Sequence, residues 1–136
     1  MRGVNGLSLT VLPERLAICR LSPDESLPEC VAHARFWSAT RTDEELSIVL
    51  PEETVPAGWQ AETGYRCLKV LGPLDLSLTG MLASLAVPLA EASVSIFAIS
   101  TYDTDYVLVR EGDLERAKRA LLASDHVFVE LQQRGP

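Results

Sequence analysis

The sequence predicts an α+β protein in which antiparallel sheets carry helices on one face. Three observations lead to this fold class. Several short stretches alternate apolar and other residues with a period of two, as strands do. Two further stretches, 81–89 and 114–122, repeat apolar residues every three or four positions, as amphipathic helices do. In the second half of the chain these elements follow one another as β-α-β-β-α-β, the ferredoxin-like order.

The first half is rich in strands and poor in helix. Two β-prone runs, 7–12 and 15–21, are separated by Pro13 and Glu14, and such a short connection predicts a hairpin. Both faces of the second run are largely apolar, which is typical of a strand that is covered on both sides. The remaining elements are expected in this order: a loop at 22–28, a short helix at 29–34 and strands at 35–40 and 46–50.

A boundary between two halves is predicted close to residue 60. Residues 51–63 carry two prolines, a glycine and three glutamates, a composition that is typical of a linker. Trp59 lies within this stretch, and we expect its ring to act as a structural anchor. The chain is therefore divided into an N-terminal part, residues 1–60, and a C-terminal part, residues 61–136.

The second half opens with a strand at 65–71, in which apolar residues alternate around Lys69. Asp75 or Ser77 could cap the helix that follows. Pro88 lies deep in the helical pattern, and because proline costs about 3 kcal/mol in a helix interior, a kink or a shortened helix is expected there. The helix buries one apolar stripe, formed by Met81, Leu82, Leu85, Ala86 and Leu89.

The rest of the chain predicts a hairpin, a second helix and a closing strand. Strands at 94–100 and 106–109 flank the turn residues 102–105. A last strand is predicted at 127–131. The buried stripe of the second helix is expected to consist of Leu114, Ala117, Leu121 and Leu122.

Charge and composition argue against several classes of function. The chain carries 19 Asp and Glu against 12 Lys and Arg, so neither nucleic acid nor an anionic membrane surface is an expected partner. Its apolar stretches are too short to span a bilayer and its N-terminus lacks a signal-peptide pattern, which favours a cytoplasmic location. The three cysteines have no CxxC spacing, so no metal site, cofactor or disulfide framework is predicted. His33 and His126 are expected at the surface or at its rim.

One stretch of the second half is recognisable. Residues 94–111, which include the segment Ser-Thr-Tyr-Asp-Thr-Asp at 100–105, closely resemble a stretch of the ACT-like proteins related to the CASTOR arginine sensors. Gly80 and the segment 86–90 fit the same pattern, so the resemblance also accounts for Pro88.

The first half carries the resemblance more weakly, in the segments 9–15 and 36–42. The family implies two ferredoxin-like βαββαβ modules in tandem: a degenerate ACT-like module over residues 1–60 and an ACT domain over residues 61–136. The sensors have four modules in one chain and this sequence has two, so the resemblance implies a homodimer.

The resemblance also implies a binding site. In the sensors an amino acid lies where two modules meet, between a loop leading into a helix and the end of a neighbouring strand. Ser93 departs from the pattern, because bacterial relatives typically have Gly at this turn, and a positive φ there would be strained. Carried over to this sequence, the candidate ligand-binding residues are Thr79, Gly80, Ile99, Ser100, Thr101 and Asp105.

These residues suit the two charges of an amino acid. Its ammonium needs a carboxylate and carbonyl oxygens, which Asp105 and the exposed end of the Ile99 strand could provide. Its carboxylate needs convergent amide hydrogens, which a helix beginning near Thr79 and Gly80 could provide. The alternative is structural: Asp103 and Asp105 are also ordinary turn residues, and Gly80 could be a glycine of helix packing.

Three functions are compatible with the sequence. The first is a regulatory protein that binds an amino acid without catalysis, and the second is a structural interaction module with no ligand, docking an unknown protein partner. The third is an enzyme, which the sequence does not favour because no catalytic motif is visible and nothing makes the carboxylates of Asp103 and Asp105 converge. The sequence does not specify the amino acid.

Overall fold

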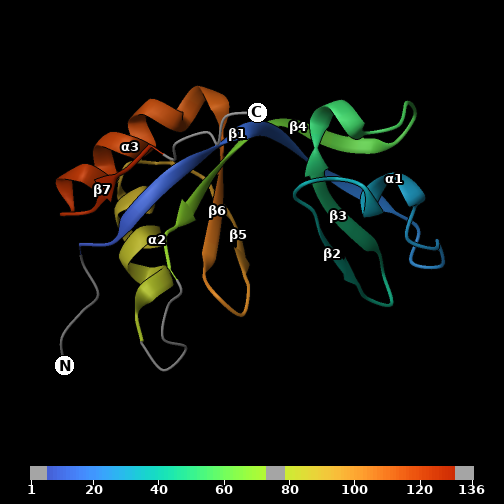
Figure 1. Ribbon diagram of the computed structural model, residues 1–136, viewed down its shortest axis with the longest axis horizontal. Coiled ribbons are helices and arrows are strands. Elements are labelled where there is room, and N and C mark those ends of the chain that lie inside the picture. Colours follow the sequence, from blue (N-terminus) through green and yellow to red (C-terminus); the bar gives the residue numbers. More distant parts are fainter. Residues whose placement is uncertain (1–5, 73–78, 131–136) are drawn as a thin grey trace, which may run out of the picture. The chain divides into compact units, whose positions relative to one another are not determined.

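The computed structural model describes residues 6–72 and 79–130, so the predicted caps Asp75 and Ser77 lie outside the described residues. The chain forms an α+β fold of two compact units, shown in Figure 1. Unit 1 comprises residues 1–12 and 66–136, and unit 2 comprises residues 13–65. These units are not the linear parts 1–60 and 61–136, because the first residues of the chain belong to the same unit as the last.

The first strand explains this arrangement. β1 runs without interruption from Ser8 to Leu21, so the predicted hairpin at Pro13 was wrong. Along β1, β7 pairs with residues 8 and 9 and β3 pairs with residues 16–21, while β4 is the other neighbour of β1 in the sheet. A proline is tolerated in a strand where its missing amide hydrogen is not required for pairing.

Unit 2 is mostly sheet. β3 (Leu46–Pro51) pairs antiparallel with β1, from Leu16 opposite Pro51 to Leu21 opposite Leu46, and β2 (Ser38–Arg41) pairs antiparallel with β3. The expected short helix is present as α1 (Glu29–Ala32), and a single 3-10 turn, η1 (Glu52–Thr54), follows β3. The ring of Trp59 packs against the core of this unit, as expected of an anchor. That core is formed by Ala17, Cys19, Val31, Leu46, Ile48 and Leu50.

Unit 1 has the predicted β-α-β-β-α-β order. β4 (Gln60–Val70) is followed by α2 (Met81–Glu91), β5 (Phe97–Ser100), β6 (Asp105–Arg110), the 3-10 turn η2 (Glu111–Asp113), α3 (Leu114–Ala123) and β7 (Val127–Phe128). The strands lie in the order β7-β1-β4-β6-β5. The closing strand predicted at 127–131 is shorter than expected, since it ends at Phe128, and it pairs parallel with β1.

Both long helices cover the same face of this sheet (Figure 1), as predicted. Their buried residues meet alternate residues of the strands in one apolar core. Leu122 was expected in this core but its side chain is 50% exposed. The core consists of Leu9, Leu68, Val70, Leu85, Leu89, Val94, Val107, Val109, Ala117 and Leu121.

The helix α2 continues past Pro88 to Glu91, so it is not shortened there. Proline has no amide hydrogen, and the carbonyl of Ser84, four residues earlier, therefore lacks its helical partner. His126 lies with Nε2 3.0 Å from this carbonyl oxygen, and its Nδ1 accepts a bond of 3.2 Å from the amide of Leu7. A ring that accepts at Nδ1 carries its proton on Nε2, which donates to Ser84. His126 is 2% exposed, so its expected surface position was wrong.

Each long helix is followed by a residue other than glycine in the left-handed region. Ser93 follows α2 with a φ of 61°, and Asp125 follows α3 with a φ of 73°. The amide of Val94 donates to the carbonyl of Leu89 over 2.9 Å, the bond that closes a Schellman motif. The strain expected for a positive φ at Ser93 is therefore present, about 1–2 kcal/mol for a residue with a Cβ.

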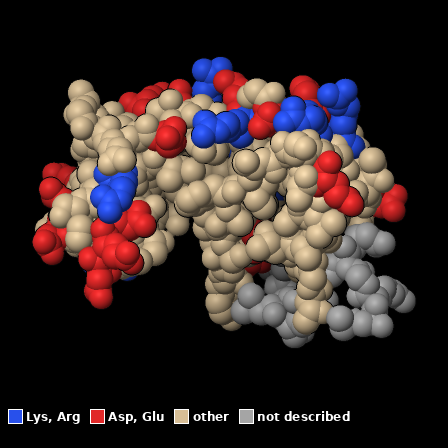
Figure 2. Space-filling view, turned by 180° about the vertical axis from the view of Figure 1, so that it is seen from behind, with Lys and Arg blue, Asp and Glu red and all other residues tan. Residues whose placement is uncertain are grey.

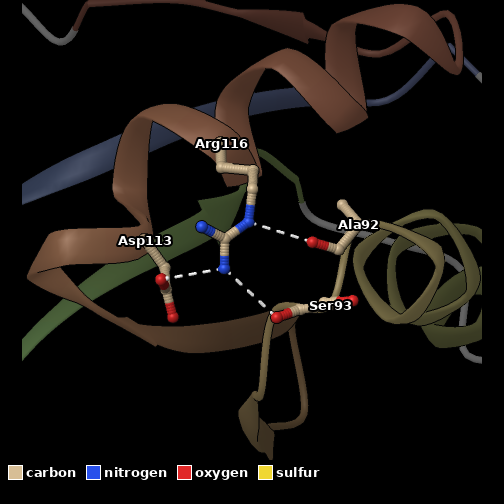
Figure 3. A network of polar contacts seen from close by, with 4 residues as sticks. All are labelled: Ala92, Ser93, Asp113 and Arg116. Atoms are coloured by element: carbon tan, nitrogen blue, oxygen red, sulfur yellow. Dashed lines mark hydrogen bonds and ion pairs between the residues drawn. The ribbon is translucent and has the colours of Figure 1, made fainter.

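Arg116 of α3 holds the end of α2, as Figure 3 shows. Its Nε donates to the carbonyl of Ala92 over 2.9 Å, and its Nη2 donates to the carbonyl of Ser93 over 3.2 Å. Nη2 also forms an ion pair of 3.0 Å with Asp113, which precedes α3. A cation at this position satisfies free carbonyls at the negative end of the helix.

Among the helices of the described residues, none has both the length and the apolar composition needed to cross a membrane.

Candidate functional site

The candidate site begins at the hairpin formed by β5 and β6. Its four-residue loop, 101–104, is closed by the amide of Thr101, which donates to the carbonyl of Thr104 over 2.8 Å. The hydroxyl of Thr101 also donates to this carbonyl and accepts from the amide of Thr104. The buried hydroxyl of Thr104 donates to the carbonyl of Val70 over 2.6 Å. The loop is therefore fixed internally and attached to β4.

Two of the predicted site residues contact each other at the end of this hairpin. Ser100 and Asp105 are opposite each other in the antiparallel register, and the hydroxyl of Ser100 donates to Oδ1 of Asp105 over 2.6 Å. Opposite residues of a strand pair share one face of the sheet, whereas Ile99, which is opposite Tyr106, points to the other face. The hairpin thus brings Ser100 and Asp105 together with Thr101 next to them, and places the Ile99 side chain apart.

The other two predicted residues, Thr79 and Gly80, lie at the start of α2 and are exposed. Gly80 has a φ of 78°, and a Cβ added to it would meet no atom within 4 Å. The described residues therefore require glycine here for its backbone conformation and not for close packing. The carbonyl of Gly80 accepts a hydrogen bond of 2.9 Å from the amide of Ser84, and this bond closes the first turn of the helix.

A pocket of about 260 Å³ opens beside the hairpin loop. It takes in Thr101 from the predicted set but none of the other five residues. Sequence reasoning missed Lys69 and Tyr106, although the polar position of Lys69 within an apolar strand was a usable signal. The pocket is lined by Lys69, Gly72, Thr101, Asp103, Thr104 and Tyr106.

The pocket combines an aromatic ring with charges of both signs. Nζ of Lys69 lies 6.0 Å from the centroid of the Tyr106 ring, within the range of a cation–π contact. Burial raises the pKa of Tyr106 above its ordinary value of 10.0, and the neighbouring Cys67 and Asp103 raise it further. The phenol therefore stays protonated at neutral pH.

Unit 2 has a smaller pocket, of about 180 Å³, on its own sheet. Arg20 and Glu62 line it, and Arg20 is engaged with the carbonyl of Glu44 over 2.9 Å. Cys19 also lines it, and burial, with a smaller effect of Cys30, raises the pKa of the Cys19 thiol to about 11. This thiol is therefore protonated at neutral pH and unsuited to metal binding or nucleophilic attack.

Side chains able to bind a metal do not gather in the part of the chain that the structure describes. Figure 2 shows Asp and Glu side chains interspersed with Lys and Arg on one face of the molecule. A surface of alternating sign lacks the continuous positive charge that binds a phosphate backbone.

Comparison with known families identifies both parts of the chain. Residues 60–123 match the model of the ACT domain, and residues 14–58 match the model of an N-terminal domain.

Two solved structures have the same fold over nearly their whole length. Protein Atu0741 from Agrobacterium tumefaciens is 33% identical with a TM-score of 0.89, and the match covers 98% of this chain and 99% of that one. The regulatory subunit of aspartate kinase from Thermus flavus is 13% identical with a TM-score of 0.62, and the match covers 90% of this chain and 99% of that one.

A curated relative carries the resemblance seen in the sequence. The cytosolic arginine sensor for mTORC1 subunit 1 of Bos taurus is 31% identical over 111 residues, which are 74% of this chain and 34% of the sensor. This chain thus spans about a third of the length of the sensor. With the ACT-domain match, this similarity shows that the chain is an ACT-domain protein related to the CASTOR arginine sensors.

Proposed function

We propose that this chain is a regulatory protein that binds a free amino acid and catalyses no reaction on it. The observation that carries the proposal is the contact between Ser100 and Asp105 at the end of the hairpin, in the stretch most similar to the arginine sensors. A carboxylate held in place by a hydroxyl is preorganised to accept an ammonium group, because its orientation is fixed before the ligand arrives.

The ligand is held at an interface between ACT modules. Asp105 accepts the ammonium with the free backbone at the end of the Ile99 strand, while the first amides of α2, after Thr79 and Gly80, donate to the ligand's carboxylate. Ser100 and Thr101 complete the site. Along the sequence we divide the two modules into residues 1–60 and 61–136, and residues 6–12 complete the compact unit of the second module.

A homodimer supplies the second side of this interface. The support is the resemblance to the sensors, which implies four modules in a sensor and two in this sequence. Two copies bring together modules that the longer relative carries in one polypeptide. Arginine is the first ligand to test, because the relative is named as an arginine sensor and a chain of net charge −7 favours a cation. We propose the cytoplasm as the location, since the relative is named as a cytosolic protein.

The test is thermal unfolding of the purified protein with each of the twenty amino acids. A ligand that binds only the folded state adds about 2.7 kcal/mol of stability at a hundredfold excess over its Kd, so the midpoint rises. Asp105→Asn should abolish the rise, and Asp43→Asn, at an exposed turn of unit 2, should leave it intact. Sedimentation equilibrium measures the dimer in the same samples.

The second candidate is an interaction module that binds no small molecule. In that case no amino acid raises the midpoint and Asp105→Asn behaves as Asp43→Asn does. The Ser100 contact then has only the structural role of closing the hairpin.

A further inference from the structure

Two opposite charges line the pocket beside the hairpin loop. Lys69 comes from β4, and Asp103 comes from the loop between β5 and β6. Within residues 6–72 and 79–130, no ion pair joins Lys69 to Asp103 or to another carboxylate. A cation and an anion that form no ion pair with any described residue therefore border one cavity.

The other polar groups of this pocket are already used by the fold. The hydroxyl of Thr101 both donates to and accepts from the backbone of Thr104, and the hydroxyl of Thr104 donates to Val70. These contacts fix the wall that carries Asp103. The ring of Tyr106, over which the Lys69 ammonium lies, also lines the pocket. Lys69 and Asp103 are thus the groups that remain to hold a ligand.

We infer that this pocket binds a small dipolar molecule, a free amino acid whose carboxylate is bound by Lys69 and whose ammonium is bound by Asp103. A ligand with both charges complements both Lys69 and Asp103, whereas a simple anion or cation would lie near a charge of its own sign. The volume of about 260 Å³ is below the range of about 300–1,000 Å³ that is usual for drug-sized ligands, which fits a molecule of amino-acid size. The ligand class rests on the proposed function, but the place differs, because the lining does not include Asp105.

The experiment combines protein variants that lack one charge of the pocket with ligand derivatives that lack one charge of the amino acid. The full chain is titrated with the amino acid that stabilises it most, with the carboxamide of that amino acid and with its N-acetyl derivative. Loss of one charge-assisted bond should weaken binding at least about tenfold. Wild-type protein should therefore prefer the free amino acid over both derivatives. Lys69→Met should lose only the preference over the carboxamide, and Asp103→Asn should lose only the preference over the N-acetyl derivative.

Matched controls separate this pocket from general effects of charge. Lys118 lies over Phe128 at 5.7 Å from the ring centroid, as Lys69 lies over Tyr106, but it does not line the pocket. Lys118→Met should leave binding unchanged, and so should Asp43→Asn. Asp103 is exposed in a loop, so Asp103→Asn keeps the fold even where Lys69→Met does not.

The outcomes separate the two proposals. If binding is lost in Asp105→Asn but unchanged in Lys69→Met and Asp103→Asn, this inference is overturned and the proposed function stands. If no amino acid binds, both are overturned. If each variant loses its own preference while the control variants keep both, the inference holds, and the ligand's two charges are bound by Lys69 and Asp103 and not by Asp105 and the first amides of α2.

Discussion

Nε2 of His126 lies 3.0 Å from the carbonyl oxygen of Ser84, the oxygen to which residue 88 cannot donate because it is a proline. This contact replaces the backbone hydrogen bond that Pro88 cannot form with one from a side chain 42 residues further along the chain. Through Nδ1 the same ring accepts a hydrogen bond from the amide of Leu7. One imidazole therefore joins α2 to the segment before β1 and to the segment before β7.

Removal of this imidazole should be costly. His126→Ala loses two hydrogen bonds, leaves the Ser84 carbonyl without its side-chain partner and opens a cavity, so we expect a loss of about 3 kcal/mol in the free energy of unfolding. Urea unfolding at neutral pH measures it. A loss below about 1 kcal/mol would mean that water replaces the ring.

Pro88→Ala gives a sharper test of the same contact. Alanine at position 88 restores an amide that donates to Ser84, so the cost of His126→Ala should fall by about 1 kcal/mol in that background. A double-mutant cycle in urea measures the coupling between the two positions. Additive effects would contradict the assigned role of His126.

The strain at the end of α2 should be removable. Ser93→Gly relieves a φ of 61° at the cost of a more flexible unfolded chain, and the net gain in unfolding free energy should be about 0.5–1 kcal/mol. Ser124→Gly is the matched control, because Ser124 ends α3 with a φ of −102° and has no such strain. Chemical unfolding should find Ser93→Gly more stable than wild type and Ser124→Gly no more stable.

Arg116 should contribute to stability through the end of α2. Arg116→Met removes the donors to Ala92 and Ser93 together with the ion pair to Asp113, and because this side chain is 45% exposed we expect a loss of about 1 kcal/mol. Arg119→Met, at an exposed position of the same helix, serves as the control. Equal unfolding midpoints for the two variants would contradict the stabilising role of Arg116 at the end of α2.

The thiol of Cys19 predicts a dependence of stability on pH. Burial raises its pKa from 9.0 to about 11, so the unfolded chain releases the proton at lower pH than the folded chain does. The stabilisation is complete below pH 9 and is lost as the pH rises toward 11. Denaturant unfolding at a series of pH values from 8 upward measures it.

The window between pH 9 and 10 is the most informative, because Tyr106, whose pKa is also raised, has an ordinary value of 10.0 and contributes above it. In Cys19→Ala the decline in stability across that window should shrink. If the decline in stability were unchanged in Cys19→Ala, the titration of other groups would be its cause.

Much of unit 1 could be predicted from the sequence. The stripe of Met81, Leu85 and Leu89 and the alternation around Lys69 are local patterns, and each determines an element without reference to the rest of the chain. The resemblance marked Ser93 as a position where a positive φ would be strained, and its φ is 61°.

What could not be predicted depends on partners that are distant in sequence. Pro13 separates two β-prone runs, and only their different partners, β3 and β7, show that the strand continues through it. Likewise His126 has no local pattern that marks it as buried, since its two partners lie 42 and 119 residues away. The apolar stripe of α3 included Leu122, which the sheet does not reach.

The candidate site also has a part that the sequence predicts and a part that it does not. The hairpin was predicted, but its turn was placed at 102–105; the loop is 101–104, and Ser100 contacts Asp105 because Asp105 is the first residue of β6. The pocket of Lys69 and Asp103 could not be predicted, because it requires β4 to lie beside β6. The sequence contains the hairpin and the strand but not their order in the sheet.

The path of β1 has a consequence for synthesis on the ribosome. Residues 13–65 form a compact unit of their own and can fold while the rest of the chain is still being translated. Residues 8 and 9 have two neighbours in the sheet that are made at different times: the amide of Leu71 donates to the carbonyl of Ser8, whereas residues 127 and 128 emerge only when almost the entire chain has been made. Until then the edge of β1 that later pairs with β7 is exposed, and a chaperone that binds extended apolar segments would find it there.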